Sequence, residues 1–306
     1  MSLQQGNIEL LAKLIQTKKE EDKAPFVLVL GAGASLSSKS PSLDEIIIKI
    51  QEISGRSLDS LSEKEIRETF YSILQELPAD ERYLLLRSLF EKATPSMGYL
   101  QLAGLVKEGY FKYILTTNFD WLLEEAFVKK GLIINKDYAI FIVGKDEEAQ
   151  ILRQLRFPRP PVKVLKLHGD LSARIFKFIP EEISEFPERL EEKISELLSQ
   201  DIVIVGYSMR DADLNRCIRG EGGAIWYINP EPPQVDTPIG QAMKKRKDSR
   251  YISNQYGKFD AFFVKLYSLV MGIPPEELRA RKTIIPEAKE QLERKEAQGR
   301  WEQELK

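Results

Sequence analysis

The chain of 306 residues contains a single histidine, His168, in the segment Lys163-Val-Leu-Lys-Leu-His-Gly-Asp170. Imidazole is the side chain whose ordinary pKa lies closest to neutrality, so a histidine is the first candidate for a general base. One histidine cannot form a pair of histidine ligands, and no other histidine competes with it for proton transfer. A lone histidine is also often a buried structural residue, so its surroundings have to decide between the two interpretations.

Polar residues also follow four other apolar segments, and each set contains groups that could bind a ligand or take part in catalysis. The motifs are Gly31-Ala-Gly-Ala-Ser35, Thr116-Thr-Asn-Phe-Asp120, Gly206-Tyr-Ser-Met-Arg-Asp211 and Asn229-Pro230. A glycine-rich turn that opens into a helix suits a pyrophosphate, because free backbone N–H groups and the helix dipole face it. The side-chain amide of Asn118 both donates and accepts, which suits a ribose or a water molecule.

Each motif also has a structural interpretation. Gly31 and Gly33 would serve a tight turn, and Leu36 stands where the dinucleotide fingerprint has glycine. Thr117, Asn118 and Asp120 would serve as cap and first-turn residues of a helix that begins at Trp121. Gly206 and Ser208 would serve a turn or admit a phosphate or ribose, and Asn229 would serve a turn or bind an adenosine ribose.

The elements that position these residues alternate between strands and helices. We expect strands at 26–30, 110–115, 138–143, 163–167, 202–205 and 224–228, and helices at 7–22, 121–130, 181–199, 212–219 and 259–270. Residues 41–109 are helical in pattern and form an insert after the first strand, and residues 231–240 form a proline-rich loop. This alternation predicts an α/β fold with a parallel, Rossmann-like sheet. We expect one domain over residues 1–270, with the insert at about 40–109, and a charged helical extension over residues 271–306.

Five of the predicted strands end in one of the polar motifs. In an open parallel sheet, ligands bind outside the carboxyl ends of the strands, where the strand order reverses. Five unrelated turns would have no reason to collect glycines, hydroxyls, amides and an imidazole on the same edge. The placement therefore favours a ligand site over five structural turns.

Composition restricts the classes of function. Hydrophobic residues make up 42% and charged residues 30%, and the formal net charge is −2, which favours neither a nucleic-acid nor a membrane partner. The single cysteine, Cys217, cannot form an internal disulfide or a four-cysteine zinc site, and its position within a helix indicates an inert core residue. No apolar run approaches the roughly 18–20 residues needed to span a bilayer. We expect a cytoplasmic protein.

The motifs together resemble the signature blocks of the sirtuin-like NAD-binding domain family, over roughly residues 25–270. The resemblance implies cofactor contacts at the Gly-Ala-Gly turn, at Gly31, Ala32, Gly33 and Ser35, with Thr117 nearby. It implies that Asn118 and Asp120 lie by the nicotinamide ribose and that His168 acts as general base on a ribose hydroxyl. It places the adenosine half of NAD near Gly206, Ser208 and Asn229.

The chain also departs from the family's deacetylases. It lacks their four zinc cysteines, and Ser40-Pro-Ser-Leu43 stands where a Gly-Ile-Pro-Asp-Phe-Arg loop usually follows the glycine turn. These differences resemble the divergent prokaryotic branch, whose members often hydrolyse NAD as effectors of anti-phage defence. The resemblance implies an NAD hydrolase without a metal that works as a homo-oligomer or beside a separate sensor such as an ATPase or an Argonaute. The alternatives are an NAD-dependent protein deacylase and a non-catalytic module that binds NAD or ADP-ribose.

Overall fold

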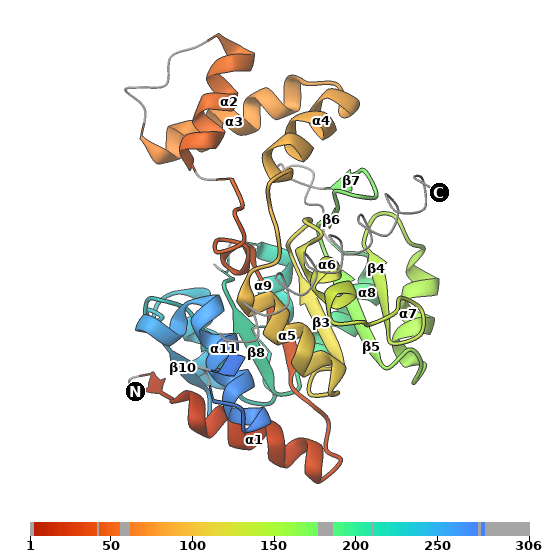
Figure 1. Ribbon diagram of the computed structural model, residues 1–306, viewed down its shortest axis with the longest axis vertical. Coiled ribbons are helices and arrows are strands. Elements are labelled where there is room, and N and C mark those ends of the chain that lie inside the picture. The colour runs from red at the N-terminus through yellow and green to blue at the C-terminus, as the bar shows by residue number, and fades with distance from the viewer. Residues whose placement is uncertain are drawn as a thin grey trace, which may run out of the picture.

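The computed structural model describes residues 3–41, 43–55, 62–176, 186–207, 209, 211–218, 220–274 and 277–278. Eight strands in this part of the chain form one sheet in the order β1-β10-β9-β8-β2-β3-β5-β4, and every neighbouring pair is parallel (Figure 1). The strands are β1 (Gln4–Gln5), β2 (Val27–Leu30), β3 (Tyr113–Thr116), β4 (Tyr138–Ile142), β5 (Val162–Lys166), β8 (Ile202–Val205), β9 (Ile225–Ile228) and β10 (Arg250–Ile252). The predicted parallel, Rossmann-like α/β fold is confirmed.

The strand order reverses beside β2. The chain proceeds from β2 to β3, β4 and β5 on one side, and then returns to β8 on the other side of β2. The carboxyl ends of β2 and β8 therefore mark the switch point at which such sheets bind ligands. A short antiparallel pair, β6 (Gly169–Asp170) and β7 (Ile175–Phe176), follows β5 on the same edge.

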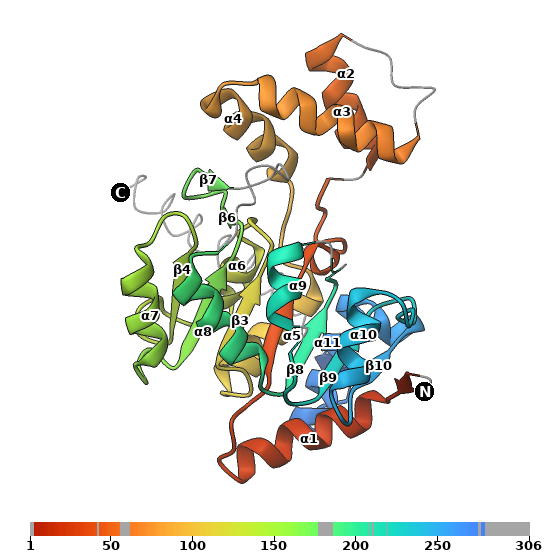
Figure 2. The ribbon, with the colours of Figure 1, turned by 180° about the vertical axis from the view of Figure 1, so that it is seen from behind.

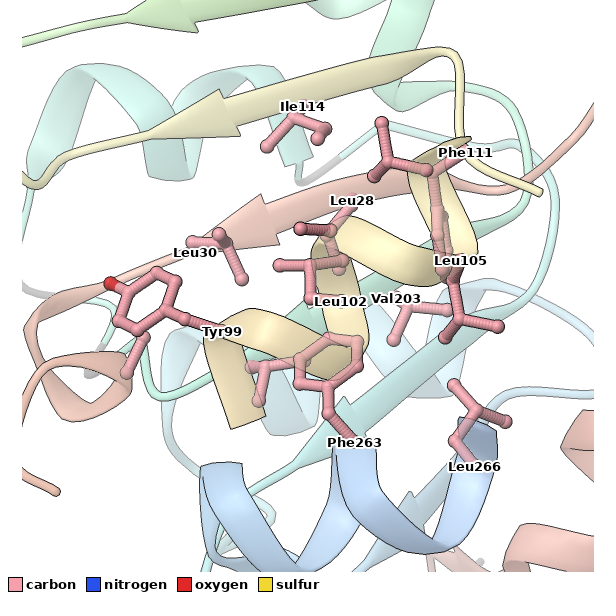
Figure 3. Close-up of a cluster of buried hydrophobic side chains, with 14 of the residues drawn as sticks. Leu28, Leu30, Tyr99, Leu102, Leu105, Phe111, Ile114, Val203, Phe263 and Leu266 are labelled. Atoms are coloured by element: carbon pink, nitrogen blue, oxygen red, sulfur yellow. The ribbon is translucent and has the colours of Figure 1, made fainter. Parts of the chain in front are cut away.

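Helices cover both faces of the sheet because its central strands are apolar on both sides. Along β2, Leu28 and Leu30 point to one core and Val27 and Val29 to the other. The first core lies under α1 (Ile8–Glu20), α5 (Met97–Lys107), α6 (Leu122–Lys129) and α11 (Phe259–Met271), as Figure 3 shows for α5 and α11. The second lies under α7 (Glu148–Arg156), α8 (Glu188–Leu198), α9 (Ala212–Ile218) and α10 (Pro238–Lys245).

The helical insert after β2 stands apart from the sheet, beyond the carboxyl edge (Figures 1 and 2). It contains α2 (Leu43–Ser54), α3 (Glu63–Glu76) and α4 (Ala79–Phe90), and Ser62 closes a capping box with Glu65 at the start of α3. Its small core meets the sheet domain through Leu171, Phe119 and Trp121. The ring of Phe90 packs edge-on against Phe119 at 5.5 Å and against Trp121 at 6.4 Å between centroids. The insert therefore rests on the loops that follow β3 and β5.

Some elements differ from the sequence-based expectation. The prediction of a proline-rich loop over 231–240 is wrong at its C-terminal end. Thr237 caps a helix that starts at Pro238, and proline is well suited to the first helical position. Helix α7 and the short strands β1 and β10 were not predicted. Helix α5 lies within the predicted insert at 40–109, but it packs against α11 and the sheet. Most of the predicted extension at 271–306 lies outside the described residues. Among the residues that are described, no helix is long and apolar enough to cross a membrane.

Candidate active site

The glycine turns after β2 and β8 touch each other, backbone to backbone. The Gly33 N–H donates to the Gly206 carbonyl at 2.8 Å, and the Gly31 N–H donates to the Val205 carbonyl at 3.1 Å. A Cβ on Gly33 would lie 2.8 Å from the Gly206 Cα, and a Cβ on Gly206, where φ is +64°, would lie 2.6 Å from the Ala34 nitrogen. Glycine is required here because no side chain fits between the two turns.

Ser35 joins the first turn to the loop after β3. Its hydroxyl donates to the Asp120 carboxylate at 2.7 Å and accepts from the Asn118 side-chain amide at 3.2 Å. Asp120 also accepts from the Leu122 N–H at 3.1 Å, so it caps the first turn of α6 as well. Burial raises the pKa of Asp120, although the hydrogen bonds from Ser35 and Leu122 and the nearby Lys166 favour its ionised form. Asp120 therefore serves the start of α6, as the structural interpretation expects, and also bonds Ser35 within the buried cluster.

Tyr99 completes this cluster, and sequence reasoning did not find it. The phenol is 1% exposed and lies 3.0 Å from the Ser35 hydroxyl and 3.4 Å from the Asn118 amide nitrogen. Because Ser35 gives its only proton to Asp120, Tyr99 must be the donor in its bond with Ser35. Figure 3 shows the ring beside the carboxyl end of β2. Burial, and then Asp120, raise the pKa of Tyr99 well above its ordinary value, so it stays protonated.

His168 lies in the loop after β5 and is buried, at 6% exposure. Its Nε2 atom is 3.9 Å from the Asp211 carboxylate, in the loop after β8. Asp213, two residues further along the chain, is also buried, and burial raises its pKa while the field of His168 lowers it. The histidine therefore faces two carboxylates, which sequence reasoning did not assign. Asp211 ends the Gly206–Asp211 motif, and that position was the signal that could have found it.

Backbone hydrogen bonds connect the loop of His168 to the loop of Asn118. The Leu167 N–H donates to the Thr116 carbonyl and the Leu171 N–H donates to the Phe119 carbonyl, each at 2.8 Å. The buried ammonium of Lys166 bonds the Asp120 carbonyl at 2.6 Å and a carboxylate oxygen of Asp170. Contacts thus connect four of the five predicted strand ends at one edge of the sheet.

The remaining predicted residues lie on the rim or apart. Ala32 is exposed, and Thr117 is half-buried with its N–H bonded to the Leu30 carbonyl. Asn229 is half-buried at the end of β9, where its side chain accepts from the Glu231 N–H at 3.1 Å. In the described part of the chain, no hydrogen bond joins Asn229 to the Ser35 cluster. Ser208 lies outside the described residues.

Comparison with known proteins identifies the family. The model of the SIR2-like domain matches residues 112–264, which contain the motifs from Thr116 to Asn229. The chain belongs to the SIR2-like domain family. The SIR2-like match begins after the Gly31–Ser35 turn, so the geometry above is what connects that turn to the rest of the site.

Solved structures of Sir2 proteins are similar to this SIR2-like chain at low sequence identity. A Sir2 homologue in complex with NAD has 18% identity over 89% of this chain and 97% of that chain, with a TM-score of 0.49. A mutant Sir2 homologue bound to ADP-ribose has 17% identity over 85% of this chain and 96% of that one, with a TM-score of 0.47. Sir2Tm bound to a propionylated peptide has 16% identity over 88% and 100%, with a TM-score of 0.42. A search among curated proteins found no match.

Proposed function

We propose that this SIR2-like protein is an NAD hydrolase that cleaves the bond between nicotinamide and ribose. The observation that carries the proposal is the buried cluster of Ser35, Asn118 and Asp120, which joins the β2 and β3 ends beside the loop of the only histidine. Membership of a family with NAD-bound and ADP-ribose-bound structural relatives supports the choice of substrate.

The switch point supports a dinucleotide placed across the edge of the sheet. Gly31, Gly33 and Gly206 allow the two turns to approach each other closely, and Ala32 beside them is exposed. The N–H groups of Gly33, Ala34 and Ser35 are already bonded within the protein, so the exposed Ala32 is the position of this turn best suited to a phosphate. Gly206, Ser208 and Asn229 would then bound the adenosine half, and Thr117 would lie beside the ribose of nicotinamide.

The charges of the site suit the chemistry of this bond. Its cleavage passes through an oxocarbenium-like state, which places positive charge on the ribose C1′ atom. The ammonium group of Lys166 bonds the carboxylates of Glu124 and Asp170, and the Asp120 carboxylate lies near enough to feel its charge. Three carboxylates thus share one ammonium group, which leaves net negative charge at the edge when all three are ionised. Such preorganised charge stabilises a developing cation without reorganisation of solvent.

The residues then have distinct roles in hydrolysis. Asn118 orients the water molecule or the ribose, and Asp120 supplies negative charge. The water oxygen bonds to C1′ as the C1′–nitrogen bond breaks, and nicotinamide leaves with the electron pair of that bond. His168 accepts the proton from water or from a ribose hydroxyl, a contribution of roughly 10²–10⁴-fold for a well-placed base. The products are nicotinamide and ADP-ribose.

Product analysis with purified protein tests the proposal. Wild-type protein should convert NAD to ADP-ribose and nicotinamide, and His168→Ala and Asn118→Ala should each abolish the reaction while preserving the fold. A His168→Ala variant that cleaves NAD at the wild-type rate would contradict the mechanism. Addition of an acetyl-lysine peptide separates the deacylase, which gives O-acetyl-ADP-ribose, from the hydrolase. Tight NAD binding with no turnover would instead favour a non-catalytic module.

We further propose that the activity is regulated, as in an anti-phage defence effector, because constitutive hydrolysis of NAD would harm the cell. The insert at 40–109 and the extension at 271–306 are the segments proposed for oligomer or partner contacts. Size-exclusion chromatography with light scattering tests the assembly. A strict monomer with full activity would contradict it.

A further inference from the structure

Lys166 is the last residue of β5 and is 1% exposed. Its ammonium group donates to the Asp120 carbonyl at 2.6 Å, to the Glu124 carboxylate at 2.7 Å and to the Asp170 carboxylate. An ammonium group has three N–H donors, so these three acceptors use all of them. Burial lowers the pKa of Lys166, but Glu124 and Asp170 outweigh it and keep the lysine charged.

The three acceptors come from the two loops that hold the proposed catalytic residues. Asp120 and Glu124 belong to the loop and helix after β3, where Asn118 lies, and Asp170 lies two residues beyond His168. Lys166 itself lies two residues before His168. One side chain therefore joins the segments on both sides of the histidine to the segment that contains Asn118 and Asp120.

Stability alone is a poor explanation for this lysine. The removal of charges from water opposes folding, and a well-packed apolar residue in place of a buried ion pair is often neutral or stabilising. Three of the other four positions of β5 show that apolar residues suit the strand, since Val162, Val164 and Leu165 are buried there. What an apolar residue cannot do is fix the separation and orientation of two polar loops through directed hydrogen bonds.

We propose that Lys166 is a positioning residue, which holds the loop of His168 and the loop of Asn118 and Asp120 in the geometry needed for catalysis. The inference rests on the proposed NAD hydrolysis for its kinetic readout. A displacement of about 1 Å between reacting groups can reduce the rate by roughly 10²-fold, so the expected effect of losing the three bonds falls on kcat. The three hydrogen bonds that the structure gives Lys166 in the described part of the chain go to the loops after β3 and β5 and not to the glycine turns, so KM for NAD should change much less.

Lys163 provides a matched control on the same strand. It is 2% exposed, and among the described residues its ammonium nitrogen has no hydrogen-bond partner. Lys163→Met and Lys166→Met thus remove the same buried group from the same strand, three residues apart, but only the second removes bonds to the loops. Lys166→Arg restores the charge and several donors in a different shape.

The single histidine allows a readout that does not depend on turnover. Protein labelled with ¹⁵N-histidine gives imidazole NMR signals from His168 alone. We expect Lys166→Met to lower kcat by roughly 10²-fold and to shift or broaden these signals, Lys166→Arg to recover part of both, and Lys163→Met to match wild type. Wild-type kcat and unchanged signals in Lys166→Met would overturn the proposal, as would equal effects in Lys163→Met.

Further measurements cover two cases, a Lys166→Met variant that does not fold and a wild-type protein that does not cleave NAD. If Lys166→Met does not fold, Asp170→Asn weakens the bond on the His168 side and keeps the oxygen that accepts from the Ala173 N–H at 2.8 Å. A shifted imidazole signal in folded Asp170→Asn supports the positioning role, and an unchanged signal overturns it. If wild-type protein does not cleave NAD, the hydrolase proposal fails, and the imidazole signals still decide whether Lys166 holds the loop of His168.

Discussion

Replacement of Gly206 by alanine tests the contact between the two glycine turns. Gly206 has φ of +64°, and an added Cβ would lie 2.6 Å from the Ala34 nitrogen and 2.7 Å from the Gly33 carbonyl carbon. Both neighbours are backbone atoms, so the clash cannot be relieved by a rotamer change. The chain offers a matched control in Gly272, which has φ of +66° and no atom within 4 Å of its added Cβ.

The difference in the free energy of unfolding between Gly206→Ala and Gly272→Ala measures the steric cost of the clash. A left-handed conformation costs an alanine about 1–2 kcal/mol, and the lower entropy of the unfolded chain returns about 0.4–1 kcal/mol. Gly272→Ala should therefore lower the free energy of unfolding by about 1 kcal/mol. Gly206→Ala carries the same term plus about 1–3 kcal/mol for overpacking, and should lower the free energy of unfolding by about 2–4 kcal/mol.

Denaturant unfolding of both variants, followed by circular dichroism, measures the two free energies. Since the clash would separate the turns, Gly206→Ala should also weaken NAD binding in calorimetry, while Gly272→Ala should bind as wild type does. Equal destabilisation by the two substitutions would refute the reasoning, because the contact between the turns would then contribute nothing.

Three further predictions concern residues around the site. Tyr99→Phe removes the hydroxyl bonded to Ser35 and Asn118, and should lower the free energy of unfolding by about 1–3 kcal/mol in denaturant titration; an unchanged midpoint would contradict this. Burial raises the pKa of Asp213, so the stability that its protonated form contributes is present at acidic pH and is lost as the pH rises through the raised value. Because asparagine mimics the protonated acid, Asp213→Asn should be more stable than wild type at neutral pH, and the gain should vanish in melts near pH 4; a gain independent of pH would contradict it. Phe90→Ala removes the ring that packs on Phe119 and Trp121 and should lower kcat by roughly 10- to 100-fold, whereas Leu84→Ala, at a side chain 61% exposed on the same helix, should not; equal rates in both variants would contradict it.

The central strands were predictable because burial on both faces leaves an unbroken apolar run. Ile202–Val205 is such a run and is a strand over those residues. The edge strands carry no such signal: β10 is Arg250–Ile252, with one fully buried side chain, and β1 is two exposed glutamines. Helix α7 buries only Ile151 and Leu155, so its apolar stripe is too sparse to stand out in the sequence.

The site was predictable to the extent that it follows from strand direction. Parallel strands bring their carboxyl ends to one edge, and this places Ser35, Asn118, Asp120 and His168 together without knowledge of any side-chain contact. Tyr99 was not predictable, since it lies in the last helix of the predicted insert, and its hydroxyl reaches Ser35 only through the packing of α5 on the sheet. Lys166 carried a readable signal, because a charge within a buried strand needs partners. The identity of those partners depends on the tertiary fold.

The segment Asn118–Trp121 shows how the insert and the sheet domain share one site. Asn118 and Asp120 are buried toward Ser35 and Tyr99, while the side chains between and after them, Phe119 and Trp121, pack on the Phe90 end of α4. Lys166 binds the same segment through the Asp120 carbonyl. A displacement of α4 would therefore act on the two proposed catalytic side chains directly, through one peptide bond, and would need no longer path through the core. We therefore expect the insert to influence the proposed site through this segment.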